Sequence, residues 1–229
     1  MKLILEAVMG SKAYGLDTPE SDTDLKGVFV ASTEEVLSLH PVKETIDRTD
    51  PDVCYHEVEK FIRLALKGNP TIIEQLFATE YTQLTWEGQI LVDNRDKFLS
   101  NIVRESYGGY AYSQAMRLQK REGESFSSQT KNRYAKHARH CFRLLQQGAE
   151  LMETGKLTLK VKNRDELFAI GKMKPADLVK KFEEEYASFK EIKSVLPDKP
   201  ETGYIDGLLL GIRFRNFGDK KMLEEYLHD

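Results

Sequence analysis

Two acidic residues near the N-terminus, Asp22 and Asp24, are the strongest candidates for chemistry in this sequence. They stand at the start of a segment, residues 24–30, whose β-branched and aromatic residues are typical of a strand. Side chains two positions apart on a strand project from the same face, so both carboxylates would point to one place. Two carboxylates this close repel each other unless a cation neutralises them, and their hard oxygen atoms suit Mg²⁺ or Mn²⁺. The pair therefore predicts a divalent metal site.

A bend of small residues, Gly10-Ser11, precedes this acidic pair. It follows a short apolar run, residues 3–8, that predicts a buried strand. A Gly-Ser bend that leaves a strand can present backbone N–H groups and a hydroxyl to phosphate oxygens, with no Cβ in the way. The bend and the carboxylates together predict a cradle for a metal ion and a triphosphate.

The sequence offers several candidates for a third carboxylate. A two-metal centre needs about one more carboxylate on a neighbouring strand, to hold the metal that activates the acceptor hydroxyl. Asp52 is the best candidate, because it begins a predicted short strand just before a predicted helix. Asp50 and Asp47 remain alternatives, because the carboxylate register around Pro51 is ambiguous.

The rest of the chain supplies elements that could position these residues. Strands are predicted at residues 3–8, 24–30, 42–47 and 52–55. Helices are predicted at residues 57–67, 71–78, 88–95, 97–120, 130–154, 164–171, 175–194 and 202–216. Because strands come first and helices second, we expect an α+β fold. A small mixed β-sheet would form a catalytic domain in residues 1–100, and a helical domain in residues 101–229 would complete the cleft for nucleotide and acceptor.

Positive charge is concentrated in the middle of the chain. Residues 117–143 contain eight Lys and Arg residues against two Glu residues, whereas the whole chain has a net charge of −3. Four residues of the predicted helix share one polar face at spacings of four, three and four: Lys136, His140, Arg143 and Gln147. Such a face would suit a triphosphate or a nucleic-acid backbone. An exposed face that carries ordinary surface ion pairs has the same pattern.

Composition excludes several classes of protein. The chain has 229 residues, of which 40% are hydrophobic and 31% are charged, as in an ordinary globular protein. Its two cysteines, Cys54 and Cys141, are too few for a disulfide framework and indicate a reducing compartment. The N-terminal segment meets Glu6 before a signal-peptide core develops, and no apolar run is long enough to span a membrane. We therefore expect a cytoplasmic protein without a membrane partner.

The motifs around these residues resemble a known family. Residues 10–15 (GSKAYG) and 21–28 (SDTDLKGV) resemble the Gly-Ser…Asp-x-Asp signature of the DNA polymerase β-like nucleotidyltransferase superfamily. Three further stretches are similar to the RNA-repair-pathway DNA polymerase β family of predicted nucleotidyltransferases: residues 52–57 (DVCYHE), 61–70 (FIRLALKGNP) and 136–144 (KHARHCFRL). These stretches occur in order, and the resemblance runs from about residue 3 to residue 170.

The resemblance implies a polymerase β palm-like core that transfers a nucleoside monophosphate from an NTP, with ATP favoured, to a hydroxyl group and releases pyrophosphate. Asp22 and Asp24 would hold two Mg²⁺ or Mn²⁺ ions, and Asp52 would complete the ion that activates the acceptor hydroxyl. The implied nucleotide-binding residues are Gly10, Ser11, Lys12, Lys136, His140 and Arg143. The protein would contribute positioning and electrostatic stabilisation rather than covalent chemistry. The family name points to an RNA or tRNA end as the acceptor.

Several alternatives remain open at the level of sequence. The acidic pair mimics the first ligands of an EF-hand loop, but Lys26 and Thr33 occupy the fifth and twelfth positions, where that loop needs an oxygen ligand and a bidentate Glu. A solvated turn rich in Asp is a further alternative. The same signature also serves transfer to a protein hydroxyl, as in minimal nucleotidyltransferase antitoxins. A catalytically idle member could bind nucleotide or RNA, although such a binder has no need for a second metal ligand.

Overall fold

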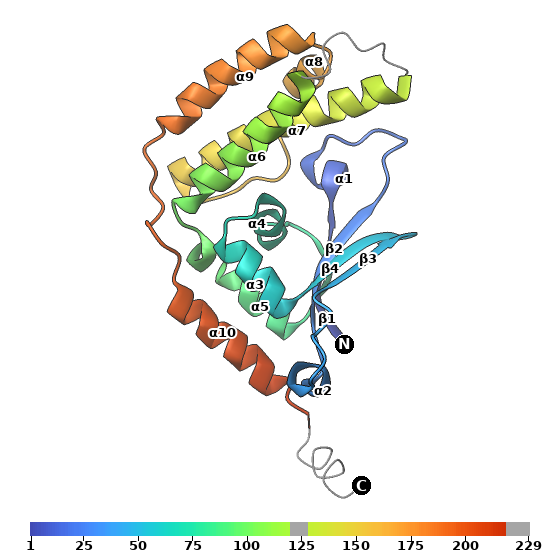
Figure 1. Ribbon diagram of the computed structural model, residues 1–229, viewed down its shortest axis with the longest axis vertical. Coiled ribbons are helices and arrows are strands. Elements are labelled where there is room, and N and C mark those ends of the chain that lie inside the picture. The colour runs from blue at the N-terminus through green and yellow to red at the C-terminus, as the bar shows by residue number, and fades with distance from the viewer. Residues whose placement is uncertain (120–127, 219–229) are drawn as a thin grey trace, which may run out of the picture.

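A mixed five-stranded β-sheet occupies the N-terminal half of the protein (Figure 1). The computed structural model describes residues 1–119 and 128–218. The strands are β1 (Lys2–Met9), β2 (Asp24–Val30), β3 (Thr45–Thr49), β4 (Asp52–Glu57) and β5 (Tyr81–Leu84). In the order β3-β4-β2-β1-β5, strands β2 and β4 run parallel and the other neighbouring pairs run antiparallel. This sheet confirms the predicted α+β fold with a small mixed sheet.

Helices fill most of the remaining chain. Near the sheet these are α1 (Gly10–Tyr14), α2 (Thr33–Leu37), α3 (Val58–Leu66), α4 (Pro70–Leu76), α5 (Trp86–Asp93) and the 3₁₀ helix η1 (Arg95–Phe98). The later helices are α6 (Ile102–Gln119), α7 (Ser128–Thr154), α8 (Arg164–Ile170), α9 (Pro175–Lys190) and α10 (Thr202–Arg215). Figure 1 shows α3, α4 and α5 beside the sheet, and α6 to α9 together beyond the end of the sheet at which α1 lies.

Local sequence explains the start of α4, as predicted. The side-chain oxygen of Asn69 accepts a hydrogen bond from the backbone N–H of Ile72 (3.3 Å), and Pro70 occupies the first helical position. In α3, the buried residues recur at spacings of three and four: Val58, Phe61, Ile62 and Ala65. These two helices therefore begin and face the core as the sequence pattern predicts.

Three short elements were not predicted from the sequence. Helix α1 follows β1 directly, helix α2 follows β2, and strand β5 lies at the edge of the sheet. Strand β5 is held by its pairing with β1, in which Leu84 lies opposite Leu5 and Gln83 opposite Glu6. Because such pairing is a long-range contact, the four residues of β5 carry little local signal for it.

The predicted helix 97–120 is divided in the structure. Helix η1 ends at Phe98, and α6 begins at Ile102. At the break, the backbone N–H of Asn101 donates to the carbonyl oxygen of Pro197 (2.8 Å), so a distant segment fixes this turn. Residues 123–127 of the predicted polar loop 123–128 lie outside the described residues. Ser128, the last residue of that predicted loop, is the first residue of α7.

One hydrophobic cluster runs through both halves of the chain, from Ile4 in β1 to Ile212 in α10. Helices α6 and α7 approach closely within it, because a Cβ added at Gly148 would lie 2.8 Å from the Cβ of Tyr107. This close packing fixes the position of α7, which carries the predicted basic face. The division into domains 1–100 and 101–229 stays a prediction.

Helix α10 returns from the C-terminal half to the far end of the sheet. The guanidinium of Arg213 makes two hydrogen bonds to the buried carboxylate of Glu57 (2.7 and 2.9 Å).

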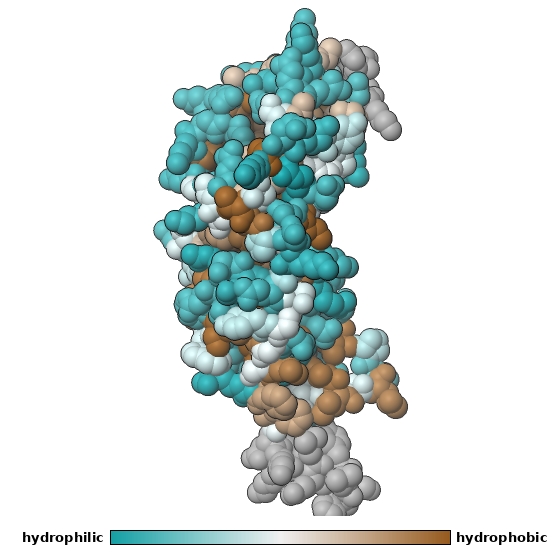
Figure 2. All heavy atoms as spheres, turned by 90° about the vertical axis from the view of Figure 1, so that its left-hand side faces the viewer, coloured by the Kyte–Doolittle hydropathy of each residue, from teal (hydrophilic) through white to brown (hydrophobic). Residues whose placement is uncertain are grey.

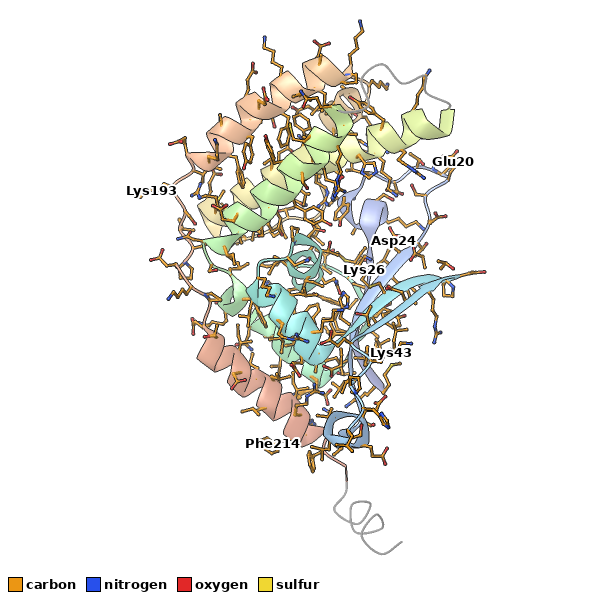
Figure 3. The ribbon with its side chains drawn as sticks, in the orientation of Figure 1. Glu20, Asp24, Lys26, Lys43, Lys193 and Phe214 are labelled. Atoms are coloured by element: carbon orange, nitrogen blue, oxygen red, sulfur yellow. The ribbon has the colours of Figure 1, made fainter. Side chains whose placement is uncertain are left out.

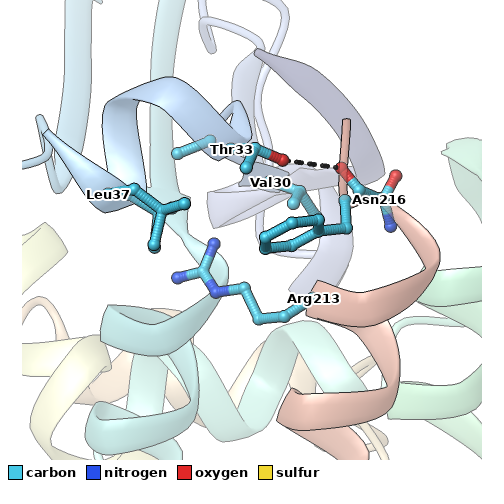
Figure 4. A pocket seen from close by; sticks show the side chains of 8 residues that line it. Val30, Thr33, Leu37, Arg213 and Asn216 are labelled. Carbon is cyan, nitrogen blue, oxygen red and sulfur yellow. Dashed lines mark hydrogen bonds between the residues drawn. The ribbon is translucent and has the colours of Figure 1, made fainter. Parts of the chain in front are cut away.

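A cavity of about 110 Å³ lies at this end of the sheet, and Val30, Leu37 and Arg213 are among the residues that line it (Figure 4). In Figure 2 apolar side chains gather near this end, where Phe214 is 72% exposed. Within the described part of the chain, no helix is both long and apolar enough to cross a membrane.

Candidate active site

Three strand ends meet at one edge of the sheet. Met9, the last residue of β1, pairs with Asp24, the first residue of β2. On the other side of β2, the parallel strand β4 pairs Val53 with Leu25, so that Asp52 lies beside Asp24. Figure 3 shows Asp24 at this edge, close to α1. The edge lies at the opposite end of β2 from the cavity of Figure 4, about 20 Å away at the rise of a β-strand.

The side chains of Asp24 and Asp52 contact each other across the two strands. Burial raises the pKa of Asp24, and a hydrogen bond to Asp52 and the charge of Asp52 raise it further. The positive charges of Lys136 and Lys26 oppose this shift. Two carboxylates that touch must share either a proton or a cation, so this pair has the donor chemistry of a divalent metal site.

Gly10 leaves the room that this carboxylate needs. Its backbone has φ +68°, a conformation that favours glycine, and a Cβ at this position would lie 1.8 Å from Oδ2 of Asp24. Any other residue at position 10 would therefore displace the carboxylate of Asp24. The bend after β1 and the first residue of β2 thus form one unit.

The structure places Asp22 differently from Asp24. Strand β2 begins at Asp24, so Asp22 is an exposed residue of the preceding loop. The expectation that the two carboxylates share a strand face therefore does not apply, because alternation requires both residues to be in the strand. Among residues 1–119 and 128–218, no three His, Cys, Asp or Glu side chains form a group that could hold a metal. A role for Asp22 in metal binding stays a prediction.

Among the candidates for the further carboxylate, Asp52 is the one that contacts Asp24. Asp50 is exposed in the turn between β3 and β4, which contains a cis peptide bond to Pro51. Asp47 is in β3, opposite Cys54, with which its side chain is hydrogen-bonded. The parallel register of β2 and β4 therefore favours Asp52.

Two further predicted residues lie on α1. Ser11 is half-buried and directly follows Gly10, and its backbone oxygen accepts a hydrogen bond from Leu16 (2.9 Å). Lys12 is exposed, and its ammonium group donates a hydrogen bond to the hydroxyl of Thr23. Lys12 thus joins α1 to the residue before β2, and its assignment to nucleotide binding stays a prediction.

The polar face of α7 passes from solvent into the core along its length. Lys136 is exposed, and its charge acts on Asp24 at the sheet edge. His140, one turn further, is mostly buried, and burial together with the charge of Arg143 lowers its pKa to about 3. Nδ1 of His140 accepts a hydrogen bond from the Arg143 guanidinium (3.0 Å). His140 is therefore a neutral acceptor in a buried network.

Arg143, which the resemblance assigns to nucleotide binding, has a side chain that is only 1% exposed, and this assignment stays a prediction. The guanidinium pairs with Glu74 of α4 (2.7 Å), which is equally buried, and donates to Gln147. Burial disfavours the charged form of Arg143, but the charge of Glu74, its hydrogen bond and the nearby tyrosines together outweigh burial, so the pKa of Arg143 is raised. The charge that was assigned to phosphate is used inside the protein.

Sequence reasoning missed two members of this network, Tyr14 and Glu74. The Tyr14 hydroxyl donates to Glu74, and the Arg143 guanidinium lies over the Tyr14 ring, 3.6 Å from its centroid. Burial and the charge of Glu74 raise the pKa of Tyr14 above its ordinary value. Tyr14 lies in the GSKAYG motif, Glu74 follows the Gly-Asn-Pro motif, and Arg143 lies in the Lys-His-Arg motif. Three separate motifs therefore meet in one buried cluster.

The comparison with protein families places this α+β chain in one of them. A model of the RNA repair pathway DNA polymerase beta family matches residues 1–198, which is most of the chain. The chain belongs to this family, and this membership confirms the resemblance seen in its motifs.

Two curated relatives match shorter parts of the chain. An uncharacterized 38.9 kDa protein of Enterobacteria phage T4 is 31% identical over 130 residues, which cover 50% of this chain and 38% of that protein. The uncharacterized protein YcgL of Bacillus subtilis is 28% identical over 79 residues, which cover 33% of this chain and 30% of that protein. The match thus spans well under half the length of either relative.

Among solved structures, the chain is similar to a nucleotidyltransferase-like protein from Exiguobacterium sibiricum. The two share 12% identity over 83% of this chain and 68% of that one, with a TM-score of 0.32. A likeness of this size does not by itself establish an activity.

Proposed function

We propose that the protein is a metal-dependent nucleotidyltransferase that transfers a nucleoside monophosphate from an NTP, with ATP favoured, to a hydroxyl of an RNA or tRNA end. The contact between Asp24 and Asp52, against the Cβ-free backbone of Gly10, is the observation that carries this proposal. Membership of an RNA repair pathway family supports the nucleic-acid acceptor. We also propose that the protein works in the cytoplasm, because its two cysteines, Cys54 and Cys141, are free.

The residues at the sheet edge fit a divalent cation. Asp24 and Asp52 supply hard oxygen ligands at a position where two negative charges already touch, and Asp22 is the further ligand proposed from the loop before β2. When bound, Mg²⁺ or Mn²⁺ would neutralise charge that develops on the phosphate and lower the pKa of the acceptor hydroxyl. Two ions are expected, as in other sites for in-line phosphoryl displacement.

The protein's own residues would bind and orient the reactants. In the transfer, the acceptor hydroxyl loses its proton and its oxygen forms a bond to the α-phosphorus, while the bond from that phosphorus to the bridging oxygen breaks and pyrophosphate leaves. The Gly10-Ser11 bend is proposed to hold the β- and γ-phosphates. Lys136, which is exposed and whose charge acts on Asp24, would approach the same phosphates with its positive charge.

The acceptor can be identified by one labelling experiment. The protein is incubated with each α-labelled NTP, with Mg²⁺ or Mn²⁺, and with a mixture of tRNA, short RNA and protein, and the species that gains label is read after electrophoresis. Label in RNA supports the proposal, and label in a protein would instead support the antitoxin-like reaction. Absence of both label and released pyrophosphate with every NTP would contradict the assignment as an enzyme and leave a nucleotide or RNA binder.

A further inference from the structure

Two arginines stack on one phenylalanine ring beside the candidate active site. Arg139 of α7 and Arg164, the first residue of α8, place their guanidinium carbons 4.5 and 4.4 Å from the ring centroid of Phe168. Stacking uses the face of a guanidinium and leaves the N–H groups at its edge available to acceptors. The ring therefore holds both cations in fixed positions without neutralising them.

Neither arginine has a carboxylate partner among the residues that the structure describes. Burial and the positive charge of Arg164 lower the pKa of Arg139, so the two charges act on each other unfavourably. Glu166 is a near neighbour in sequence, but its carboxylate accepts from Asn163 (2.8 Å) and lies 3.8 Å from Lys181. Arg139 is half-buried and Arg164 is exposed, and an anion bound between them would relieve the repulsion of the two like charges.

The pair lies next to the loop that leads to the acidic residues. Nε of Arg164 donates to the backbone oxygen of Gly15 (2.9 Å), and another of its nitrogens donates to that of Asp17 (3.0 Å). These carbonyls follow α1, whose five residues span about 7 Å from the Gly10-Ser11 bend. On α7, Arg139 lies three residues after Lys136, whose charge acts on Asp24. The two arginines therefore continue the positive surface outward from the nucleotide site.

We propose that Arg139 and Arg164 form a phosphate-binding site for the acceptor strand, which takes a phosphodiester of single-stranded nucleic acid outside the nucleotide site. This inference rests on the proposed function, because it assumes that the NTP phosphates occupy the Gly10-Ser11 bend at the other end of α1. The spacing of about one α1 length suits a neighbouring phosphate on a strand whose terminal hydroxyl lies at Asp24 and Asp52. A guanidinium group can match two phosphate oxygens, which suits Arg139. Arg164 already donates from two of its nitrogens to backbone oxygens, so it would contribute its remaining N–H groups and its charge.

The test measures binding, so it does not depend on transfer. The affinity of the full chain for a short fluorescein-labelled single-stranded oligouridine is measured by anisotropy over a series of salt concentrations. Arg139→Gln and Arg164→Gln should each weaken binding about five- to tenfold at low salt. Each should also reduce the slope of log affinity against log salt by about 0.7, the value for one lost contact to a single strand. Arg139→Lys keeps the charge and should restore most of the slope.

A matched control comes from the other side of the molecule. Arg95 is also exposed and stacks on a phenylalanine, with its guanidinium carbon 5.1 Å from the ring centroid of Phe77, but it lies away from the sheet edge. Arg95→Gln should leave affinity and salt slope unchanged. Because Arg164 also holds backbone oxygens, Arg139→Gln with an unchanged melting temperature is the decisive variant.

The outcomes separate this inference from the proposed function. An Arg139→Gln protein that binds oligouridine with the parental slope overturns the phosphate site, whatever its transfer activity. In a second contrary outcome, inorganic triphosphate displaces oligouridine from the parental protein but not from either glutamine variant. That result would assign the two arginines to the NTP and would also overturn the proposed acceptor site. Parental protein that binds RNA through these arginines but releases no pyrophosphate would retain the site and reject the enzyme.

Discussion

The protein contains two charge clusters that look alike in sequence but differ in chemistry. At the sheet edge, Asp24 and Asp52 are like charges in contact, and the pKa of Asp24 is raised. In the buried cluster, Glu74 and Arg143 carry opposite charges, and each side chain is 1% exposed. Glu74 also accepts a hydrogen bond from Tyr14, at the other end of α1 from Gly10, and Arg143 donates one to Gln147. The buried ion pair is satisfied within the fold, whereas the carboxylate pair needs a partner from outside. The difference distinguishes a structural cluster from a candidate reactive one.

The stacked arginines, Arg139 and Arg164, belong with the carboxylate pair in this comparison. They too are like charges that the described part of the protein does not neutralise. One pair would bind cations and the other would bind anions, and Lys136 lies between them on α7. An anionic ligand carrying bound metal would satisfy both pairs at once.

The largest expected effect is on the carboxylate pair. Asp24→Asn keeps the shape of the side chain but removes a metal-binding charge, so we expect nucleotide transfer to fall at least about a thousandfold with little loss of stability. The measurement is pyrophosphate release together with thermal unfolding. Asp47→Asn, an exposed change on β3, is the matched control and should retain activity. Loss of activity in the control alone would move the third carboxylate to β3.

Breaking the buried pair should have the opposite signature. Arg143→Met leaves Glu74 buried without its cation, so we expect a loss of about 3 kcal/mol in the free energy of unfolding. Chemical denaturation of the variant and of the double variant Arg143→Met/Glu74→Leu measures this, and the double variant should recover most of the loss. A stable Arg143→Met protein with a raised KM for NTP would show that the guanidinium binds nucleotide after all.

The comparison also shows what the sequence could predict. The starts of β2 and β4 and the Gly10-Ser11 bend follow from local patterns, and the structure brings Gly10, Asp24 and Asp52 together. The burial of Arg143 could not be predicted, because helical spacing shows that residues share a face but not what covers that face. Its partner Glu74 is 69 residues away in sequence. A buried carboxylate on α4 leaves no local signal beyond its position among apolar neighbours.

Asp22 illustrates a smaller limit of the same kind. The Asp-x-Asp spacing indicates a shared face only if the strand extends through both residues, and β2 begins at the second. Boundaries of strands depend on pairing, and the pairing of Met9 with Asp24 ends this one. The motif therefore indicates where β2 begins, while the orientation of the Asp22 carboxylate depends on the loop before the strand.

Titration of the carboxylate pair should sharpen the comparison further. The raised pKa of Asp24 means that the folded protein binds this proton more tightly than the unfolded chain does. Its contribution to stability is therefore present at low pH and is lost as the pH rises through the raised pKa. Mn²⁺ competes with the proton, so its affinity should increase about tenfold per pH unit below that pKa and level off above it.

Calorimetry can count this proton. Titration with MnCl₂ in buffers of different ionisation enthalpy should show release of about one proton per site at a pH below the raised pKa, and fewer as the pH rises through it. The Asp24→Asn protein should release none, because its amide does not titrate. Affinity for Mn²⁺ that does not change with pH would contradict a shared proton between Asp24 and Asp52. No such metal dependence is expected of the Glu74–Arg143 pair, whose charges already balance.

The smallest effect should come from Lys136, which lies between the two kinds of cluster. It is exposed, like a surface charge, but it acts on Asp24 and shares its helix with the buried Arg143. Lys136→Ala should raise the KM for NTP about fivefold with kcat unchanged, since an exposed cation contributes modestly to phosphate binding. Lys131→Ala, also exposed on α7, is the control. The same KM for NTP in the Lys136→Ala and Lys131→Ala proteins would show that Lys136 is only a solvated surface charge. Contacts between α7 and phosphate would then begin at Arg139.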